Sequence, residues 1–134
     1  MSVIAARVYT DRITVAADSI LVKGWSKRNN NFSKILNING MIVGGTGSAH
    51  ECGLMWNYME THLPASATEK AVLNFIVEFA SWKKDFDGSS HVDNIYLMAF
   101  DGHLFEINHM FVHEIIDYIA VGAGEDFANA ALYL

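Results

Sequence analysis

Short runs of β-branched and apolar residues near the N-terminus predict two antiparallel hairpins. Four such runs are residues 3–9, 12–17, 34–38 and 41–45. The tight connection Thr10-Asp11 joins the first two runs, and Asn39-Gly40 joins the last two. Asn-Gly between apolar runs is a strong hairpin signal, because both residues tolerate positive φ. The intervening residues 19–33 are polar, rich in Lys and Asn, and have no clear period.

A helical period follows the second hairpin. From Ser48 the apolar residues recur at helical spacing until Pro64; they are Leu54, Met55, Tyr58, Met59 and Leu63. Thr68 is the expected N-cap of a second helix, with Glu69 in its first turn and Gly88 at its end. The predicted buried stripe of this second helix is Val72, Phe75, Ile76, Phe79 and Trp82.

The last part of the chain returns to strands. Residues 94–100 and 103–107 flank an Asp101-Gly102 turn, and a third run covers residues 115–121. A final helix is expected from about Glu125 to the end of the chain. The order ββββ-αα-βββ-α predicts an α+β fold in layers, with largely antiparallel strands and with helices covering sheet faces.

Length and composition favour one globular domain over residues 1–134. Of the 134 residues, 51% are hydrophobic and 18% charged, which excludes a disordered chain. No window reaches the ~18 consecutive apolar residues of a membrane helix. The first residues lack the basic and apolar segments of a signal peptide, so we expect a cytoplasmic protein. Cys52 stands alone, which excludes an internal disulfide, and is expected to be a small buried residue.

Charge is distributed unevenly along the chain. Residues 1–34 carry six basic groups against two acids, a balance of +4, whereas residues 85–134 carry nine acids and no Lys or Arg. An acidic chain with one short basic stretch is a poor ligand for nucleic acid, so we expect no nucleic-acid partner and no membrane partner. The opposite charges would let copies meet head to tail, although a solvated acidic surface explains the C-terminal part more simply.

Candidate chemistry begins at Ser2. Removal of Met1 would leave Ser2 as the N-terminus, and an N-terminal Ser carries its nucleophile and its base in one residue, because the α-amine accepts the hydroxyl proton. Asp18 follows an apolar strand, and Lys34 opens the next hairpin. Residues 44–49, with sequence Gly-Gly-Thr-Gly-Ser-Ala, join a strand to a helix N-terminus, where backbone N–H groups stabilise an oxyanion or a phosphate.

With these residues in place, the chain resembles the proteasome β-subunit family, including the simpler bacterial proteasome-like peptidases of the HslV type. The resemblance runs through nearly the whole chain. The matching segments are Ala16-Ala17-Asp18-Ser19, Lys34, Gly44 to Cys52, Ile119 to Gly124, and Phe127 to Ala131. It implies the four-layer αββα sandwich of N-terminal-nucleophile hydrolases. Because the sequence ends at Leu134 and family members continue, we expect a version shortened at the C-terminus.

The resemblance also implies the role of each site residue. Ser2 occupies the position of the family's threonine nucleophile, and Asp18 and Lys34 follow at the family's intervals. Lys34 would lower the proton affinity of Ser2, Asp18 would keep Lys34 charged, and Gly47 would supply the oxyanion amide, with Gly45 as the weaker candidate. A peptide or unfolded polypeptide would add as a strand. Its predicted binding residues are Leu21, Val22, Gly45 and Ala49.

The family works as rings, so we expect a homo-oligomer of two stacked rings, with an ATP-dependent unfoldase as a candidate partner. Neither a metal nor another cofactor is expected, because His103, His109 and His113 lack a ligand pattern. His50 and Cys52 are two residues apart on one helix and do not face each other. Among the aspartates, a solvated turn is favoured over calcium binding for Asp85, Asp87 and Asp93.

Two alternatives to the peptidase stay open. The first is a catalytically silent proteasome-like subunit with a structural or assembly role. It is favoured by Ala123, which replaces a serine usual in active members, by the early end of the sequence, and by any retention of Met1. The second is an amide hydrolase of the same fold that acts on a small molecule, which a closed pocket and a monomeric state would favour.

Overall fold

The computed structural model describes residues 3–17, 20–23, 26–29 and 34–122. The described strands are β1 (Val3–Val8), β2 (Ile13–Ala17), β3 (Ile20–Lys23), β4 (Ser26–Asn29), β5 (Ile35–Ile38), β6 (Met41–Thr46), β7 (Ile95–Phe100), β8 (His103–Asn108), β9 (Phe111–Ile115) and β10 (Tyr118–Gly122). The described helices are α1 (Ala49–Met59) and α2 (Glu69–Asp87). Neither of these two helices is long and apolar enough to cross a membrane.

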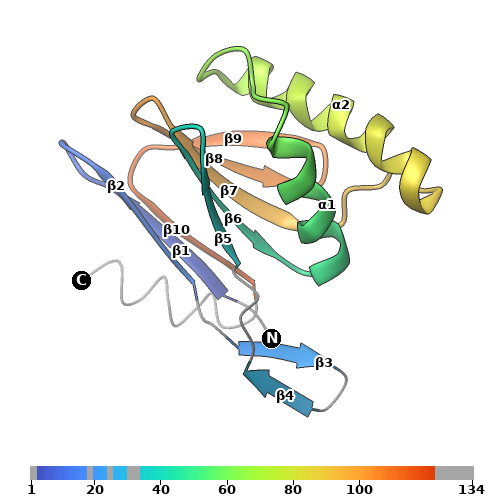
Figure 1. Ribbon diagram of the computed structural model, residues 1–134. Coiled ribbons are helices and arrows are strands. Elements are labelled where there is room, and N and C mark those ends of the chain that lie inside the picture. The colour runs from blue at the N-terminus through green and yellow to red at the C-terminus, as the bar shows by residue number, and fades with distance from the viewer. Residues whose placement is uncertain (1–2, 18–19, 24–25, 30–33, 123–134) are drawn as a thin grey trace.

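The strands form two larger sheets and one separate hairpin. The five-stranded sheet has the order β5-β6-β7-β8-β9, and the three-stranded sheet has the order β10-β1-β2. All neighbouring strands are antiparallel, including the isolated pair β3 and β4. Figure 1 shows α1 and α2 on one face of the five-stranded sheet and the three-stranded sheet on its other face. The described residues therefore form three layers, αββ.

Strand β7 lies at the centre of both cores, and its side chains alternate between them. Tyr96 and Met98 pack in the cluster under the helices, whereas Leu97 and Ala99 pack in the cluster between the sheets. Successive side chains of a strand point to opposite faces. Because both faces of β7 are covered, residues 95–100 form a continuous apolar run instead of an alternating one.

The two sheets approach closely where a glycine faces the opposite strand. A Cβ atom built on Gly44 of β6 would lie 2.8 Å from the Ile4 Cγ2 atom of β1. Ile4 is fully buried between the sheets with Ala6, Leu97 and Leu104. The absence of a side chain at Gly44 thus makes room for β1 over β6.

The predicted turns and helix caps are confirmed. Asn39 and Gly40 both have positive φ, at 53° and 76°. Thr68 caps α2, and its Oγ1 accepts a hydrogen bond from the Ala71 N–H at 3.2 Å. Gly88 ends α2 in the left-handed conformation at φ 76°.

Three boundaries differ from the sequence-based expectation. Residues 19–33 contain the hairpin β3–β4, in which the short apolar run Ile20-Leu21-Val22 pairs with a polar strand. The run 115–121 is not one strand, because β9 ends in the five-stranded sheet and β10 begins in the three-stranded one. At the crossing, the Asp117 carboxylate accepts the Tyr118 N–H at 2.7 Å and its carbonyl accepts the Val8 N–H at 2.7 Å. The first helix ends at Met59 instead of near Pro64.

The predicted helix from about Glu125 lies outside the described residues. The fourth layer of the expected αββα sandwich depends on that helix and stays a prediction.

Candidate active site

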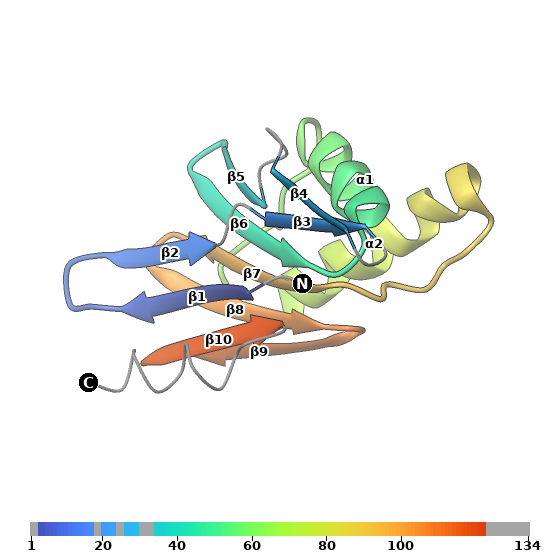
Figure 2. The same cartoon turned by 90° about the horizontal axis from the view of Figure 1, so that it is seen from below.

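The site residues predicted from the N-terminal segment are only partly described. Ser2 and Asp18 lie outside the described residues. Leu21 and Val22 belong to β3, where they pair with Arg28 and Lys27 of β4. Figure 1 shows this hairpin apart from the two larger sheets, and in the view from below in Figure 2 it lies in front of β6. Within the described part of the chain β3 pairs with β4 alone, so one edge of β3 carries no strand.

Lys34 and Gly45 are held together by the start of the β5–β6 pairing. Lys34 directly precedes β5 and is only 6% exposed. Its carbonyl accepts the N–H of Gly45 at 3.0 Å. This hydrogen bond occupies the N–H of Gly45. It also fixes the Lys34 backbone beside Gly45, which precedes Gly47 by two residues.

The second glycine, Gly47, lies just past the end of β6. It is exposed and has φ +113°, a conformation that strongly favours glycine. Ser48 follows as the N-cap of α1, and its Oγ accepts the N–H of Glu51 at 3.2 Å. Ala49 is the first residue of α1 and is half-buried. The predicted oxyanion loop is therefore an exposed strand-to-helix turn with a rigid element on either side.

Behind this loop lies a buried polar cluster formed by Glu51 and Asn94, which are 3% and 1% exposed. The Asn94 side chain bonds both backbone groups of Ser48: its Oδ1 accepts the N–H at 2.7 Å, and its Nδ2 donates to the carbonyl at 2.8 Å. The Glu51 carboxylate accepts the backbone N–H groups of Asp93 and Asn94 at 2.8 and 3.1 Å. It also accepts the hydroxyl of Tyr96 at 2.8 Å.

Burial keeps the two weaker acids of this cluster protonated. Burial raises the pKa of the Cys52 thiol to about 11, against the lowering effects of the Asn94 hydrogen bond and the Lys34 charge. Burial, followed by the neighbouring Cys52 and Glu51, raises the pKa of Tyr96 well above its usual range. Tyr96 therefore keeps its proton and donates a hydrogen bond to Glu51, and Cys52 is an inert thiol and not a nucleophile.

Glu51 and Asn94 are not among the residues predicted from the sequence, although one signal for Glu51 is present there. Glu51 precedes Met55 by four residues and therefore lies on the apolar stripe of α1. A carboxylate on a buried stripe needs hydrogen-bond partners. Asn94 carries no comparable signal, because Asn directly before a strand is ordinary in a turn.

A pocket of about 270 Å³ opens beside the loop, at the N-terminal end of α1 and the C-terminal end of α2. It is lined by Ser48, His50, Glu51, Lys83, Asp87, Ser89 and Asp93. Asp87 accepts hydrogen bonds from Lys83 Nζ at 2.8 Å and lies 3.3 Å from His50 Nε2. The bond from Lys83 is the main cause of the lowered pKa of Asp87. His50 is thus paired with Asp87, away from the buried Cys52.

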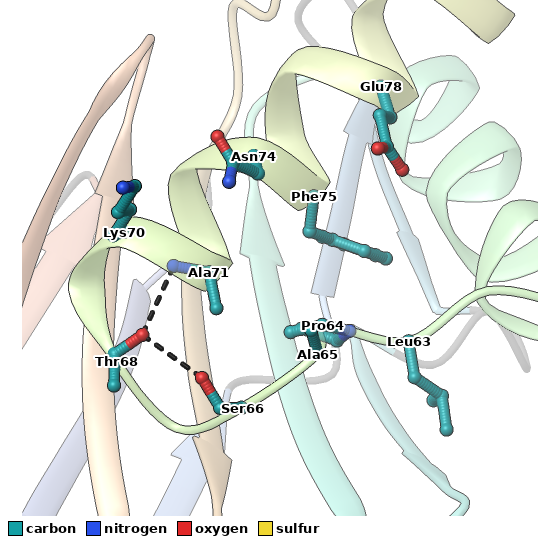
Figure 3. A pocket seen from close by; sticks show the side chains of 10 residues that line it. All are labelled: Leu63, Pro64, Ala65, Ser66, Thr68, Lys70, Ala71, Asn74, Phe75 and Glu78. Carbon is teal, nitrogen blue, oxygen red and sulfur yellow. Dashed lines mark hydrogen bonds between the residues drawn. The ribbon is translucent and has the colours of Figure 1, made fainter.

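A pocket of about 320 Å³ lies at the opposite end of the helix pair (Figure 3). The connector Leu63–Ser66 and the first turns of α2 form its walls, and Thr68 Oγ1 lies 3.2 Å from Ser66 Oγ. None of the predicted site residues lines this pocket. It is therefore a groove separate from the candidate active site.

The three histidines near the end of the chain have separate partners. His103 Nδ1 lies 2.8 Å from a Glu114 oxygen, and His109 Nδ1 lies 3.1 Å from the Val92 carbonyl. His113 Nδ1 lies 3.9 Å from a Glu69 oxygen. The part of the chain that the structure describes contains no group of three His, Cys, Asp or Glu side chains arranged to hold a metal ion.

Comparison with known proteins gives a fold assignment. No protein-family model matches the sequence, and no curated protein matches it either. Among solved structures, BPH of Thiobacillus denitrificans, a bacterial proteasome homologue, superposes with a TM-score of 0.88 at 22% identity, covering 99% of this chain and 77% of that one. The same protein in complex with epoxomicin gives 0.87 at 21% identity, with 98% and 77% covered.

A more distant match is eukaryotic HslV from Trypanosoma brucei, with a TM-score of 0.70 at 19% identity, covering 96% of this chain and 76% of that one. The chain has a proteasome-like fold. The resemblance inferred from the sequence is thereby confirmed at the level of the fold. In this proteasome-like fold, the exposed Gly47 loop and the buried Lys34 lie in adjoining elements.

Proposed function

We propose that this protein is a proteasome-type endopeptidase that cleaves peptide bonds with Ser2 as its N-terminal nucleophile. Removal of Met1 exposes the α-amine, which then serves as the base for the Ser2 hydroxyl. An α-amine has a pKa of about 7.7–8, so it accepts a proton near neutral pH without much adjustment. The proteasome-like fold supports this proposal, and serine takes the place of the family's threonine.

The observation that carries the proposal is a buried lysine, Lys34, bonded through its backbone to β6, the strand that leads to the turn at Gly47. A lysine that is 6% exposed is costly to bury, which favours a specific role for its charge. The Gly45 amide is bonded to the Lys34 carbonyl at 3.0 Å, whereas Gly47 is exposed beyond the end of β6. This difference favours Gly47 over Gly45 as the oxyanion donor.

The chemistry proceeds in two stages. Ser2 Oγ attacks the carbonyl carbon of the scissile bond, and the α-amine takes the hydroxyl proton. The Gly47 N–H stabilises the negative oxygen of the tetrahedral intermediate. The amine returns the proton to the leaving nitrogen, which leaves an ester on Ser2. Water, deprotonated by the same amine, then attacks this ester, and the amine returns the proton to Ser2 Oγ as the acid product leaves.

Lys34 and Asp18 adjust the proton affinities at this site. A positive charge near the Ser2 hydroxyl and amine lowers the proton affinity of both. Asp18 keeps Lys34 in its charged form and in place. Neither residue forms a bond to the substrate, and both act through the proton affinities of the Ser2 hydroxyl and α-amine.

The substrate in this proposal is a peptide or an unfolded polypeptide that binds as an added strand. The open edge of β3 at Leu21 and Val22 would form one side, and the loop from Gly45 to Ala49 the other. Backbone hydrogen bonds of this kind give affinity without demanding one sequence. BPH binds epoxomicin, a peptide epoxyketone, which supports a peptide ligand for this fold.

We further propose a homo-oligomer of two stacked rings in the cytoplasm, with an ATP-dependent unfoldase as a candidate partner. One face of α2 exposes Leu73 and Val77, which lie one turn apart and are 36% and 52% accessible in the single chain. Apolar groups of this size on one helix face favour a contact between subunits. A monomeric mass by light scattering at micromolar concentration would contradict the ring.

A silent structural subunit is the second candidate. Ala123 favours it, because active members usually carry a serine there and this chain lacks that hydroxyl. A subunit that retains Met1 would also be silent, since its Ser2 amine is blocked. Intact-mass measurement separates the two candidates, because the peptidase requires loss of Met1.

Hydrolysis of a fluorogenic peptide library by purified variants tests the peptidase. Ser2→Ala should abolish cleavage, and Ser2→Thr should retain it. Lys34→Ala should lower kcat by roughly 10²–10⁴-fold, the usual value of acid–base assistance. Asp18→Asn should have an intermediate effect. Equal activity of Ser2→Ala and the parent protein would refute the proposal.

A further inference from the structure

We propose that Glu51 and Asn94 are positioning residues that orient the Gly47 amide toward the oxyanion. This inference rests on the proposed function and adds two residues to it that do not touch the substrate. A donor stabilises an oxyanion only when its N–H is already aimed at the oxygen, so the orientation of this amide has a direct effect on the rate.

The Gly47 amide lies between two restrained residues. On one side, Thr46 pairs with Ile95 at the end of the β6–β7 ladder, and its hydroxyl donates to the Ile95 carbonyl at 3.3 Å. On the other side, both backbone groups of Ser48 are bonded to the Asn94 carboxamide at 2.7 and 2.8 Å. With both flanks fixed, Gly47 has little freedom to rotate its N–H.

The Asn94 carboxamide also lies directly against Gly47. A Cβ atom built on Gly47 would lie 2.3 Å from Asn94 Oδ1. A side chain at this position would therefore displace the Asn94 clamp, the pair of hydrogen bonds from the Asn94 carboxamide to the Ser48 backbone. Gly47 is therefore required for two reasons, its φ of +113° and its contact with Asn94.

Glu51 fixes the position of Asn94. Its two carboxylate oxygens accept the backbone N–H groups of Asp93 and Asn94 and so hold the segment that enters β7. The Glu51 backbone in turn donates to the Ser48 hydroxyl at 3.2 Å. The hydrogen bonds form a closed circuit from Ser48 to Glu51, to Asn94 and back to Ser48.

A structural role alone does not require this circuit. Position 51 lies on the apolar stripe of α1, between the sheet and α2, where an apolar side chain would avoid the desolvation of a carboxylate. The hydroxyl of Ser48 already caps the helix. What the buried Glu51 and Asn94 add is one fixed geometry for the loop that begins at Gly47.

The test compares steady-state cleavage by Asn94→Ala, Glu51→Gln and Val72→Ala. Asn94→Ala removes the clamp, and Glu51→Gln keeps the shape of the side chain but replaces one acceptor by a donor. We expect both to lower kcat by about 10- to 100-fold with KM changed less than about twofold, because loosening a donor costs less than deleting it. Their inhibition constants for a peptide aldehyde, which forms a tetrahedral adduct with the hydroxyl, should rise by a similar factor.

Val72→Ala controls for lost stability, because Val72 is fully buried on the inner face of α2 and its apolar side chain forms no hydrogen bond to Ser48 or Asn94. All assays are made below the unfolding temperature of every variant. If kcat falls in all three variants in proportion to their loss of Tm, the positioning role is wrong and the proposed function stands. If the parent protein neither cleaves peptides nor binds the aldehyde, both proposals fall together. Parent-like kcat in a folded Asn94→Ala also overturns the positioning role.

Discussion

Substitution of Gly45 by alanine measures how tightly the site is packed behind its loop. A Cβ atom there would lie 2.7 Å from the Cys52 sulfur and 3.0 Å from the Tyr96 ring. Both distances are below ordinary van der Waals contact, and both neighbours are buried. Overpacking of this kind costs about 1–3 kcal/mol, and we expect roughly 2–3 kcal/mol because two neighbours are too close.

A double-mutant cycle with Cys52→Ala assigns this cost to the sulfur. Cys52→Ala alone removes one buried atom and should cost about 1 kcal/mol. In the double variant Gly45→Ala/Cys52→Ala the sulfur clash is gone, while the contact with the Tyr96 ring stays. The two changes should therefore be non-additive by about 1 kcal/mol, with the double variant more stable than the sum predicts.

Gly44→Ala is the matched control, because its Cβ would meet Ile4 at 2.8 Å and not Cys52. Combined with Cys52→Ala it should be additive within about 0.5 kcal/mol. Urea unfolding followed by circular dichroism gives the free energy of unfolding of each variant. Additivity at Gly45, or equal coupling at Gly44 and Gly45, would show that the described packing around the sulfur is incorrect.

Two further predictions concern pH and the helices. Because the pKa of Cys52 is about 11 in the folded protein and 9.0 for an unperturbed thiol, its contribution to stability is complete below pH 9 and is lost between pH 9 and about 11. Two pKa units correspond to roughly 2–3 kcal/mol, and Cys52→Ala should remove this part of the alkaline loss in urea titrations at several pH values. Gly53→Ala should raise the free energy of unfolding by about 0.5–1 kcal/mol, because Gly53 lies inside α1 with open space at its Cβ. Gly88→Ala should lower it by about 1 kcal/mol, because Gly88 has φ +76°; an equal effect of the two in thermal melts would contradict this reasoning.

Local signals predicted most elements of the fold. The Asn39-Gly40 turn, the Thr68 cap and the Gly88 end depend on the conformations of single residues, and each is found where the sequence places it. Long-range strand pairing was not predictable in this way. Near Asp117 the chain crosses from the five-stranded sheet to the three-stranded sheet, and an apolar run does not indicate which sheet its strand joins.

The candidate site was predictable only where a family resemblance or a conformational rule applied. The glycine-rich sequence indicated the loop at residues 44–49, and the family resemblance singled out Gly47, which has a positive φ in the structure. The clamp of Asn94 on Ser48 joins residues 46 positions apart, so it depends on the β6–β7 pairing and has no local signature. Glu51 was detectable in principle, as a charge on an apolar stripe, but its partners are known only from the structure.

The direct test of the Ser2 mechanism is the intact mass of the protein after incubation with epoxomicin. A peptide epoxyketone reacts with both the hydroxyl and the free α-amine of an N-terminal nucleophile. We predict a chain that has lost Met1 and carries one equivalent of inhibitor, with no adduct on Ser2→Ala. A folded protein that has lost Met1, yet forms no adduct and cleaves no peptide, would contradict the catalytic account and support the silent subunit.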